Sequence, residues 1–84
     1  MQTKYPLIAM SAVFDRVKNA QHWKNPIDTT IVVRGEDVQR ELDVIREAVI
    51  FYTGSVPMFQ DCGPSLDGTC FRVTAAGYFL TIGA

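Results

Sequence analysis

The sequence contains few of the residues that catalytic and metal sites use most. Its 84 residues include one histidine, His22, and two cysteines, Cys62 and Cys70. A structural zinc site needs four ligands, and these three residues lack the close pairwise spacing that such sites have. The glycine-rich patterns that bind phosphate, GxGxxG and GxxxxGK, are also absent from the sequence. We therefore expect neither a metal nor another cofactor, and the sequence names no catalytic residue.

An excess of charge of one sign is also lacking. The chain has 8 lysines and arginines against 9 aspartates and glutamates, so its formal net charge is −1. General nucleic-acid-binding proteins usually carry a basic excess, because contacts to phosphate supply most of their affinity. Nucleic acid is therefore not an expected partner of this chain.

One short segment is nevertheless locally rich in positive charge. It is basic and aromatic, and it consists of Arg16, Lys18, His22, Trp23 and Lys24. Such a group can bind phosphates and stack a base. The simpler interpretation is that Trp23 anchors a helix in the core while the lysines are solvated.

No hydrophobic run is long enough to cross a membrane. The apolar run at residues 5–14 is interrupted by Pro6 and Ser11, and it falls far short of the about 20 residues that a membrane-spanning helix needs. It does not make a credible secretory signal either. We therefore expect a soluble, cytoplasmic protein without a membrane contact, in which Cys62 and Cys70 stay reduced.

The sequence does contain enough apolar material for one packed domain. Hydrophobic residues make up 48% of the chain and charged residues 20%, which is typical of a globular domain and not of a disordered one. A chain of 84 residues allows one domain and no more. We expect a single compact domain over residues 1–84.

A helix and a strand are predicted in the first part of the chain. Residues 11–23 carry apolar side chains at helical spacing, and Pro26 ends that helix. Residues 5–10 stay open, because they either extend the helix, with Pro6 at its first position, or form a short strand before it. Residues 29–34 are rich in β-branched side chains and predict a strand.

The clearest predicted element is a helix over residues 37–52. An apolar side chain recurs every three or four residues along it, as on one face of a helix. Asp37 lies in its first turn, and Gly54 supplies a C-terminal cap. The last turns are apolar on every side and must be covered, either by the N-terminal helix or by another subunit. Three side chains lie off the main stripe: Val44, Ile50 and Phe51.

The chain is predicted to close with a β-hairpin. Residues 71–74 and 78–82 are rich in β-formers, and the stretch 75–77 between them suits a tight turn. Residues 63–68, between the cysteines, are expected to form a loop, and residues 56–59 are a candidate for one more short strand. The predicted fold class is α+β. Two helices pack on a small, mainly antiparallel sheet of three to four strands, in the order α-β-α-β-β.

The surplus of apolar surface predicts association with another protein, because an uncovered strand or helix end can pair with a second chain. We expect a non-enzymatic interaction module that forms a homo-oligomer, with a dimer favoured and a different protein as the second kind of partner. Short chains without a catalytic constellation are common among accessory proteins of phages and mobile elements. A narrower hypothesis is therefore an inhibitor of a host defence system, of the anti-CRISPR kind. The candidate interface consists of Val44, Ile50, Phe51, Tyr78, Leu80 and Ile82.

A pocket between helix and sheet is the alternative functional site. It would bind a small ligand or carry a minor catalytic activity, using His22, Arg72, Tyr78 or a cysteine. This hypothesis requires that at least two of these polar groups converge on one concave site. The candidate polar site consists of His22, Trp23, Lys24 and Arg72.

Overall fold

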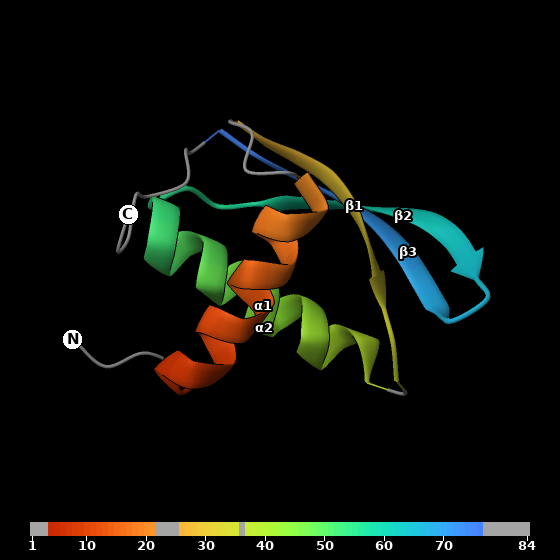
Figure 1. Ribbon diagram of the computed structural model, residues 1–84, viewed down its shortest axis with the longest axis horizontal. Coiled ribbons are helices and arrows are strands. Elements are labelled where there is room, and N and C mark those ends of the chain that lie inside the picture. Colours follow the sequence, from red (N-terminus) through yellow and green to blue (C-terminus); the bar gives the residue numbers. More distant parts are fainter. Residues whose placement is uncertain (1–3, 22–25, 36, 77–84) are drawn as a thin grey trace.

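The computed structural model describes residues 4–21, 26–35 and 37–76, and these residues form an α+β fold. The elements follow one another as α1 (Leu7–Gln21), β1 (Ile27–Val33), α2 (Val38–Thr53), β2 (Met58–Ser65) and β3 (Gly68–Ala75). The two helices cross each other on one side of a three-stranded antiparallel sheet (Figure 1). The predicted fold class and element order are confirmed.

α1 begins directly after Pro6. The Pro6 carbonyl accepts hydrogen bonds from the amides of Ala9 and Met10, both at 3.1 Å, as in the first turn of a helix. The helical alternative for this segment is therefore correct, and the short strand is not formed. The core-facing side of α1 consists of Met10, Val13, Phe14 and Val17.

α2 has the predicted C-terminal cap at Gly54, whereas Asp37, predicted to lie in the first turn, is the N-cap. The Asp37 carboxylate accepts a hydrogen bond from the Arg40 amide at 3.0 Å, which satisfies one of the unpaired amides of the first turn. Gly54 ends the helix with φ 78°, and its amide donates to the Ile50 carbonyl at 2.8 Å. Glycine suits this position because it adopts positive φ without a steric cost.

The buried face of α2 is wider than the predicted stripe. Ile45 and Val49 on that stripe are buried, but so are Val44 and Ala48 beside it. α2 contacts α1 as well as β1, so it buries two adjacent sectors of its surface. The assignment of Val44 to an interface with another chain is therefore wrong. Its side chain is 7% exposed and belongs to the core of this chain.

The sheet has the order β1-β3-β2. β2 and β3 form a hairpin, with Leu66-Asp67 as its turn. The loop predicted over residues 63–68 is instead the tip of that hairpin. Pro64 favoured a loop in the sequence, but β2 lies at the edge of the sheet, where a strand tolerates a residue without an amide hydrogen.

The predicted pairing of residues 71–74 with residues 78–82 is wrong. β3 lies between β1 and β2, so both of its edges are already paired. Thr74, for example, lies opposite Asp28 on one side and Met58 on the other. Residues 78–82 themselves lie outside the described part of the chain.

Side chains of the sheet alternate between two faces, and only one of these packs on the helices. The buried side chains of β1 and β3 alternate along each strand, as expected for a sheet covered on one side. The core face carries Ile27, Ile31, Val33, Phe71 and Val73. The opposite face carries Asp28, Thr30, Arg72 and Thr74.

Candidate functional site

The candidate site is the edge of β1 that points away from β3. No described strand pairs with that edge. The amide of Asp28 donates to Oε1 of Gln21 at 2.7 Å, and the carbonyl of Val32 accepts from Nη2 of Arg16 at 3.2 Å. Both partners lie on α1, so the backbone polar groups of Asp28 and Val32 face away from the sheet.

The backbone of Thr30 faces the same edge. In an antiparallel pair, every second residue directs its N–H and C=O toward the same side. Thr30 lies midway between Asp28 and Val32, so its N–H and C=O also point away from β3. The edge of β1 thus presents three residues, and α1 caps the first and the last of them.

Gln21 is the cap at the start of β1. Its side chain is buried, and besides accepting from Asp28 it donates from Nε2 to the Pro26 carbonyl. Arg16 is the cap at the other end, one and a half turns earlier on α1. Between these two caps, no described residue bonds to the outward-facing backbone of Thr30, so this is the open position of the edge.

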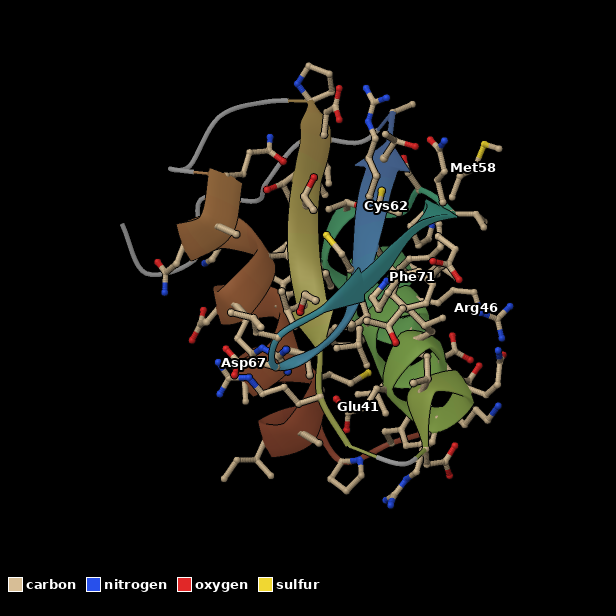
Figure 2. All side chains as sticks on the ribbon, turned by 90° about the vertical axis from the view of Figure 1, so that its right-hand side faces the viewer. Glu41, Arg46, Met58, Cys62, Asp67 and Phe71 are labelled. Carbon is tan, nitrogen blue, oxygen red and sulfur yellow. The ribbon has the colours of Figure 1, made fainter. Side chains whose placement is uncertain are left out.

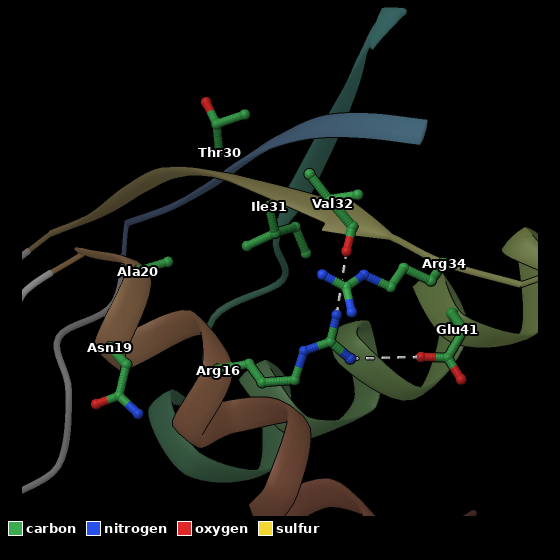
Figure 3. Close-up of a pocket in the computed structure, with 8 residues that line it drawn as sticks. All are labelled: Arg16, Asn19, Ala20, Thr30, Ile31, Val32, Arg34 and Glu41. Carbon is green, nitrogen blue, oxygen red and sulfur yellow. Dashed lines mark hydrogen bonds and ion pairs between the residues drawn. The ribbon is translucent and has the colours of Figure 1, made fainter. Parts of the chain in front are cut away.

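A groove follows this edge. It encloses about 670 Å³ between α1, β1 and the first turn of α2 (Figure 3). Figure 3 shows the side chains of Arg16 and Arg34 extending into the groove, while the Thr30 side chain points out of it. The described residues that line the groove are Arg16, Asn19, Ala20, Thr30, Ile31, Val32, Arg34 and Glu41.

Positive charge exceeds negative charge among these lining residues. Two guanidinium groups face a single carboxylate, that of Glu41. Arg16 lies 3.7 Å from Glu41, and Arg34 lies 3.8 Å from Asp67, which is outside the groove. Both pairs are long and exposed, and such pairs contribute only about 0–1 kcal/mol. Neither arginine is therefore held closely by a carboxylate, although Arg16 also donates to the Val32 carbonyl.

The opposite edge of the sheet, formed by β2, is less suited to pairing with another strand. Its register shifts between Asp61 and Gly63, so a bulge interrupts the strand at Cys62 (Figure 2). The Asp61 carboxylate accepts the Gly63 amide at 2.8 Å, and Pro64 offers no amide hydrogen. Bulges and prolines are common means of blocking an exposed edge. The edge of β1 is the more regular of the two.

Of the candidate polar site, the structure describes Arg72 alone. Arg72 donates two hydrogen bonds to Asp28, both at 2.9 Å, on the sheet face away from the helices. These bonds hold the pKa of Asp28 below its ordinary value. His22, Trp23 and Lys24 lie outside the described residues. Arg72 does not line the groove at β1, and its guanidinium is already bound.

The remaining candidate interface residues differ in exposure. Phe51 is 43% exposed, with its ring edge against Tyr52 at 5.0 Å between centroids, and Ile50 is half-buried. Tyr52 in turn stacks on Phe14 of α1 at 4.6 Å. α1 therefore covers part of the apolar end of α2 and leaves Phe51 accessible. Three further members of the candidate interface lie outside the described residues: Tyr78, Leu80 and Ile82.

The local basic group does not form one surface in its described members. Arg16 extends into the groove, whereas Lys18 is buried and lies 5.4 Å from the centre of the Phe14 ring. The Lys18 amine is 3.6 Å from the Asp15 carboxylate. These two cations therefore serve different parts of the fold.

Sequence reasoning missed the groove, although it noted Arg16 and the strand that contains Thr30. The signal in the sequence is weak, because nothing local to residues 29–34 tells whether that strand is central or at an edge. Strand order decides this, and strand order is set by long-range pairing.

Within the described residues, no group of three or more histidines, cysteines, aspartates and glutamates is placed to hold a metal ion. None of the described helices is long and apolar enough to cross a membrane. Cys62 and Cys70 are both free thiols, the first exposed and the second half-buried. Comparison of the chain with protein-family models, curated proteins and solved structures found no match.

Proposed function

We propose that this chain is a small, non-enzymatic protein-interaction module that binds an extended segment of another polypeptide as an added strand on β1. The observation that supports this proposal is the open position at Thr30, between the caps supplied by Gln21 and Arg16. In strand addition, main-chain hydrogen bonds provide the affinity and side-chain contacts provide the specificity. Thr30 offers one donor and one acceptor for such bonds.

The groove around Thr30 is the space that the added segment would occupy. Its volume of about 670 Å³ lies in the range of ordinary binding sites. α1 forms one wall, with Asn19 and Ala20 as its central residues. A segment paired with β1 would pack against that wall, which adds side-chain contacts to the main-chain hydrogen bonds.

A second copy of the chain can serve as the partner and would form a dimer. Two β1 strands can pair in antiparallel fashion about Thr30, which then lies opposite Thr30 of the other copy. This pairing makes two hydrogen bonds without displacing either cap, and more if Gln21 and Arg16 move aside. Association of this kind needs only the surface that each copy already presents.

The proposal is tested with a proline at the centre of the edge. The Thr30 amide points away from β3, so Thr30→Pro removes no hydrogen bond of the sheet but blocks an added strand. The probe is a displayed library of random peptides, selected on the unaltered protein. We expect the selected peptides to bind Thr30→Val and to lose at least about tenfold in affinity for Thr30→Pro.

Amide spectra of β3 serve as the control for folding, because Val73 and its neighbours in that strand should keep their resonances in both variants. Selected peptides that bind Thr30→Pro as tightly as Thr30→Val would show that the β1 edge is not the binding site. Failure to select any binder would also contradict the proposal.

A further inference from the structure

We infer that the segment bound at the β1 edge is acidic, with a carboxylate side chain that reaches Arg16 and Arg34. This inference rests on the proposed function, because it names the chemistry of the segment that the edge receives. The two arginines come from different parts of the chain, one from α1 and one from the residue after β1, and both line the same groove.

Neither arginine has a close carboxylate partner, and Arg16 has donors besides the one that it gives to the Val32 carbonyl. Their present carboxylate partners are at 3.7 and 3.8 Å, whereas a charge-assisted hydrogen bond of good geometry is about 2.7–2.9 Å long. The Arg16 and Arg34 side chains are 48% and 74% exposed, so water screens these pairs. A guanidinium can bind a carboxylate through two parallel hydrogen bonds, which rewards an incoming aspartate or glutamate.

The backbone of β1 favours an extended peptide over the phosphate backbone of a nucleic acid. Thr30 presents a carbonyl as well as an amide to the groove. A phosphate can accept from the amide and from the arginines, but it has no hydrogen to donate to the carbonyl. An extended peptide supplies both a donor and an acceptor at the spacing of the strand. It therefore satisfies the polar groups of this edge more completely.

A second copy of β1 offers Arg16 and Arg34 fewer carboxylate partners than an acidic segment does. The one acidic residue of β1 is Asp28, and in a pairing centred on Thr30 it lies opposite Val32. Its carboxylate is on the other sheet face, where Arg72 holds it. Self-pairing thus leaves Arg16 and Arg34 without a new carboxylate. We expect an acidic segment to compete with self-association.

The experiment compares two synthetic peptides with alternating threonine and valine, one with a central glutamate and one with glutamine in its place. We expect the glutamate peptide to bind about tenfold more tightly at low salt, with the advantage shrinking as ionic strength rises. Arg34→Gln should reduce that advantage without weakening the glutamine peptide, because Arg34 makes no hydrogen bond to β1. Arg16→Gln should reduce it too, but it also releases the Val32 carbonyl.

The outcomes separate this inference from the function on which it rests. If both peptides bind equally and both are lost in Thr30→Pro, strand addition stands and the acidic preference is overturned. If neither peptide binds, and the peptide library yields no binder sensitive to Thr30→Pro, both are overturned. Oligothymidylate is the third probe. Binding of oligothymidylate as tight as that of the glutamate peptide, and unchanged in Thr30→Pro, would assign a phosphate site and also overturn the inference.

Discussion

At the scale of single residues, Asp43 connects the start of the chain to α2. Arg46 lies 2.6 Å from its Oδ1, Lys4 lies 2.5 Å from its Oδ2, and the Tyr5 hydroxyl donates to that same oxygen. Together these donors, Arg46 above all, hold the pKa of Asp43 far below its ordinary value. The i,i+3 pair with Arg46 is predictable from the sequence, whereas the contacts from Lys4 and Tyr5 are not.

We expect Asp43 to make the stability of the protein sensitive to acid. A lowered pKa means that its contribution is fully present above the unfolded pKa, near 3.8, and is lost as the pH falls through the lower folded value. Asp43→Asn should therefore be less stable than the unaltered chain at pH 7, and the difference should shrink below about pH 4. Urea unfolding from pH 7 to pH 2 measures this.

The matched control for that experiment is Asp15→Asn, which removes a carboxylate whose partner Lys18 is 3.6 Å away. A difference between Asp43→Asn and the unaltered chain that stays constant over the whole pH range would contradict the assignment.

Gly68, the first residue of β3, lies too close to the backbone of β1 to carry a side chain. A Cβ at this position would lie 2.3 Å from the Val33 carbonyl oxygen, which is backbone and cannot turn away. We expect Gly68→Ala to lower the free energy of unfolding by about 1–3 kcal/mol, as overpacked substitutions do. Leu66→Ala, at the fully exposed turn beside it, should change it by less than about 0.5 kcal/mol. Equal losses of unfolding free energy in the two variants would show that β3 can move to accommodate a side chain at Gly68.

At the scale of secondary-structure elements, α2 lies where the sequence predicts a helix, but its buried face is wider than the predicted apolar stripe. Its C-terminal cap at Gly54 acts over four residues, so the sequence is sufficient to find it. Its buried face depends on which elements lie against it. Because α1 packs beside the predicted stripe, Val44 is part of the core.

That assignment predicts the cost of truncating Val44. Removing two methyl groups from a side chain that is 7% exposed should lower the free energy of unfolding by about 2 kcal/mol in Val44→Ala. Ile8→Ala, at a position that is 82% exposed on α1, should have an effect below about 0.5 kcal/mol. Denaturant unfolding of both variants makes the comparison. A Val44→Ala variant that keeps full stability but loses a dimer would restore Val44 to an interface.

At the scale of the whole molecule, the order β1-β3-β2 decides which strand is available to a partner. It places β1 at one edge and β2 at the other, and only β2 carries a bulge and a proline. Both helices lie on the same sheet face, so α1 can flank the β1 edge and cap it at Asp28 and Val32. The groove is therefore a property of the assembled fold.

We expect this arrangement to produce a weak dimer. Light scattering over a concentration series should show a mass that rises toward two copies for the unaltered chain and for Thr30→Val, but stays at one copy for Thr30→Pro. The glutamate peptide should dissociate the dimer, because it occupies the same edge. A dimer that survives Thr30→Pro and dissociates in Phe51→Ser would place the contact at the exposed apolar end of α2 instead.

The sequence by itself determined the α+β class, the order of elements, α2 with its C-terminal cap, and the strand nature of residues 29–34. These features depend on spacing and on interactions between residues close together in the chain, so local patterns are sufficient to reveal them. The hairpin was misplaced because Gly63 and Pro64 have the composition of a loop, while their place on an edge strand depends on the pairing of β2 with β3.

Only the tertiary structure decided that β1 is an edge strand, that Val44 is buried, and that Arg16 and Arg34 share one groove. Each of these depends on contacts between residues far apart in the chain. The backbone of β1 can form hydrogen bonds along either of its two edges. The residues of β1 therefore do not determine which edge is paired with another strand. That choice follows from the insertion of β3 between β1 and β2, and it leaves the outer backbone of Thr30 without a described strand partner.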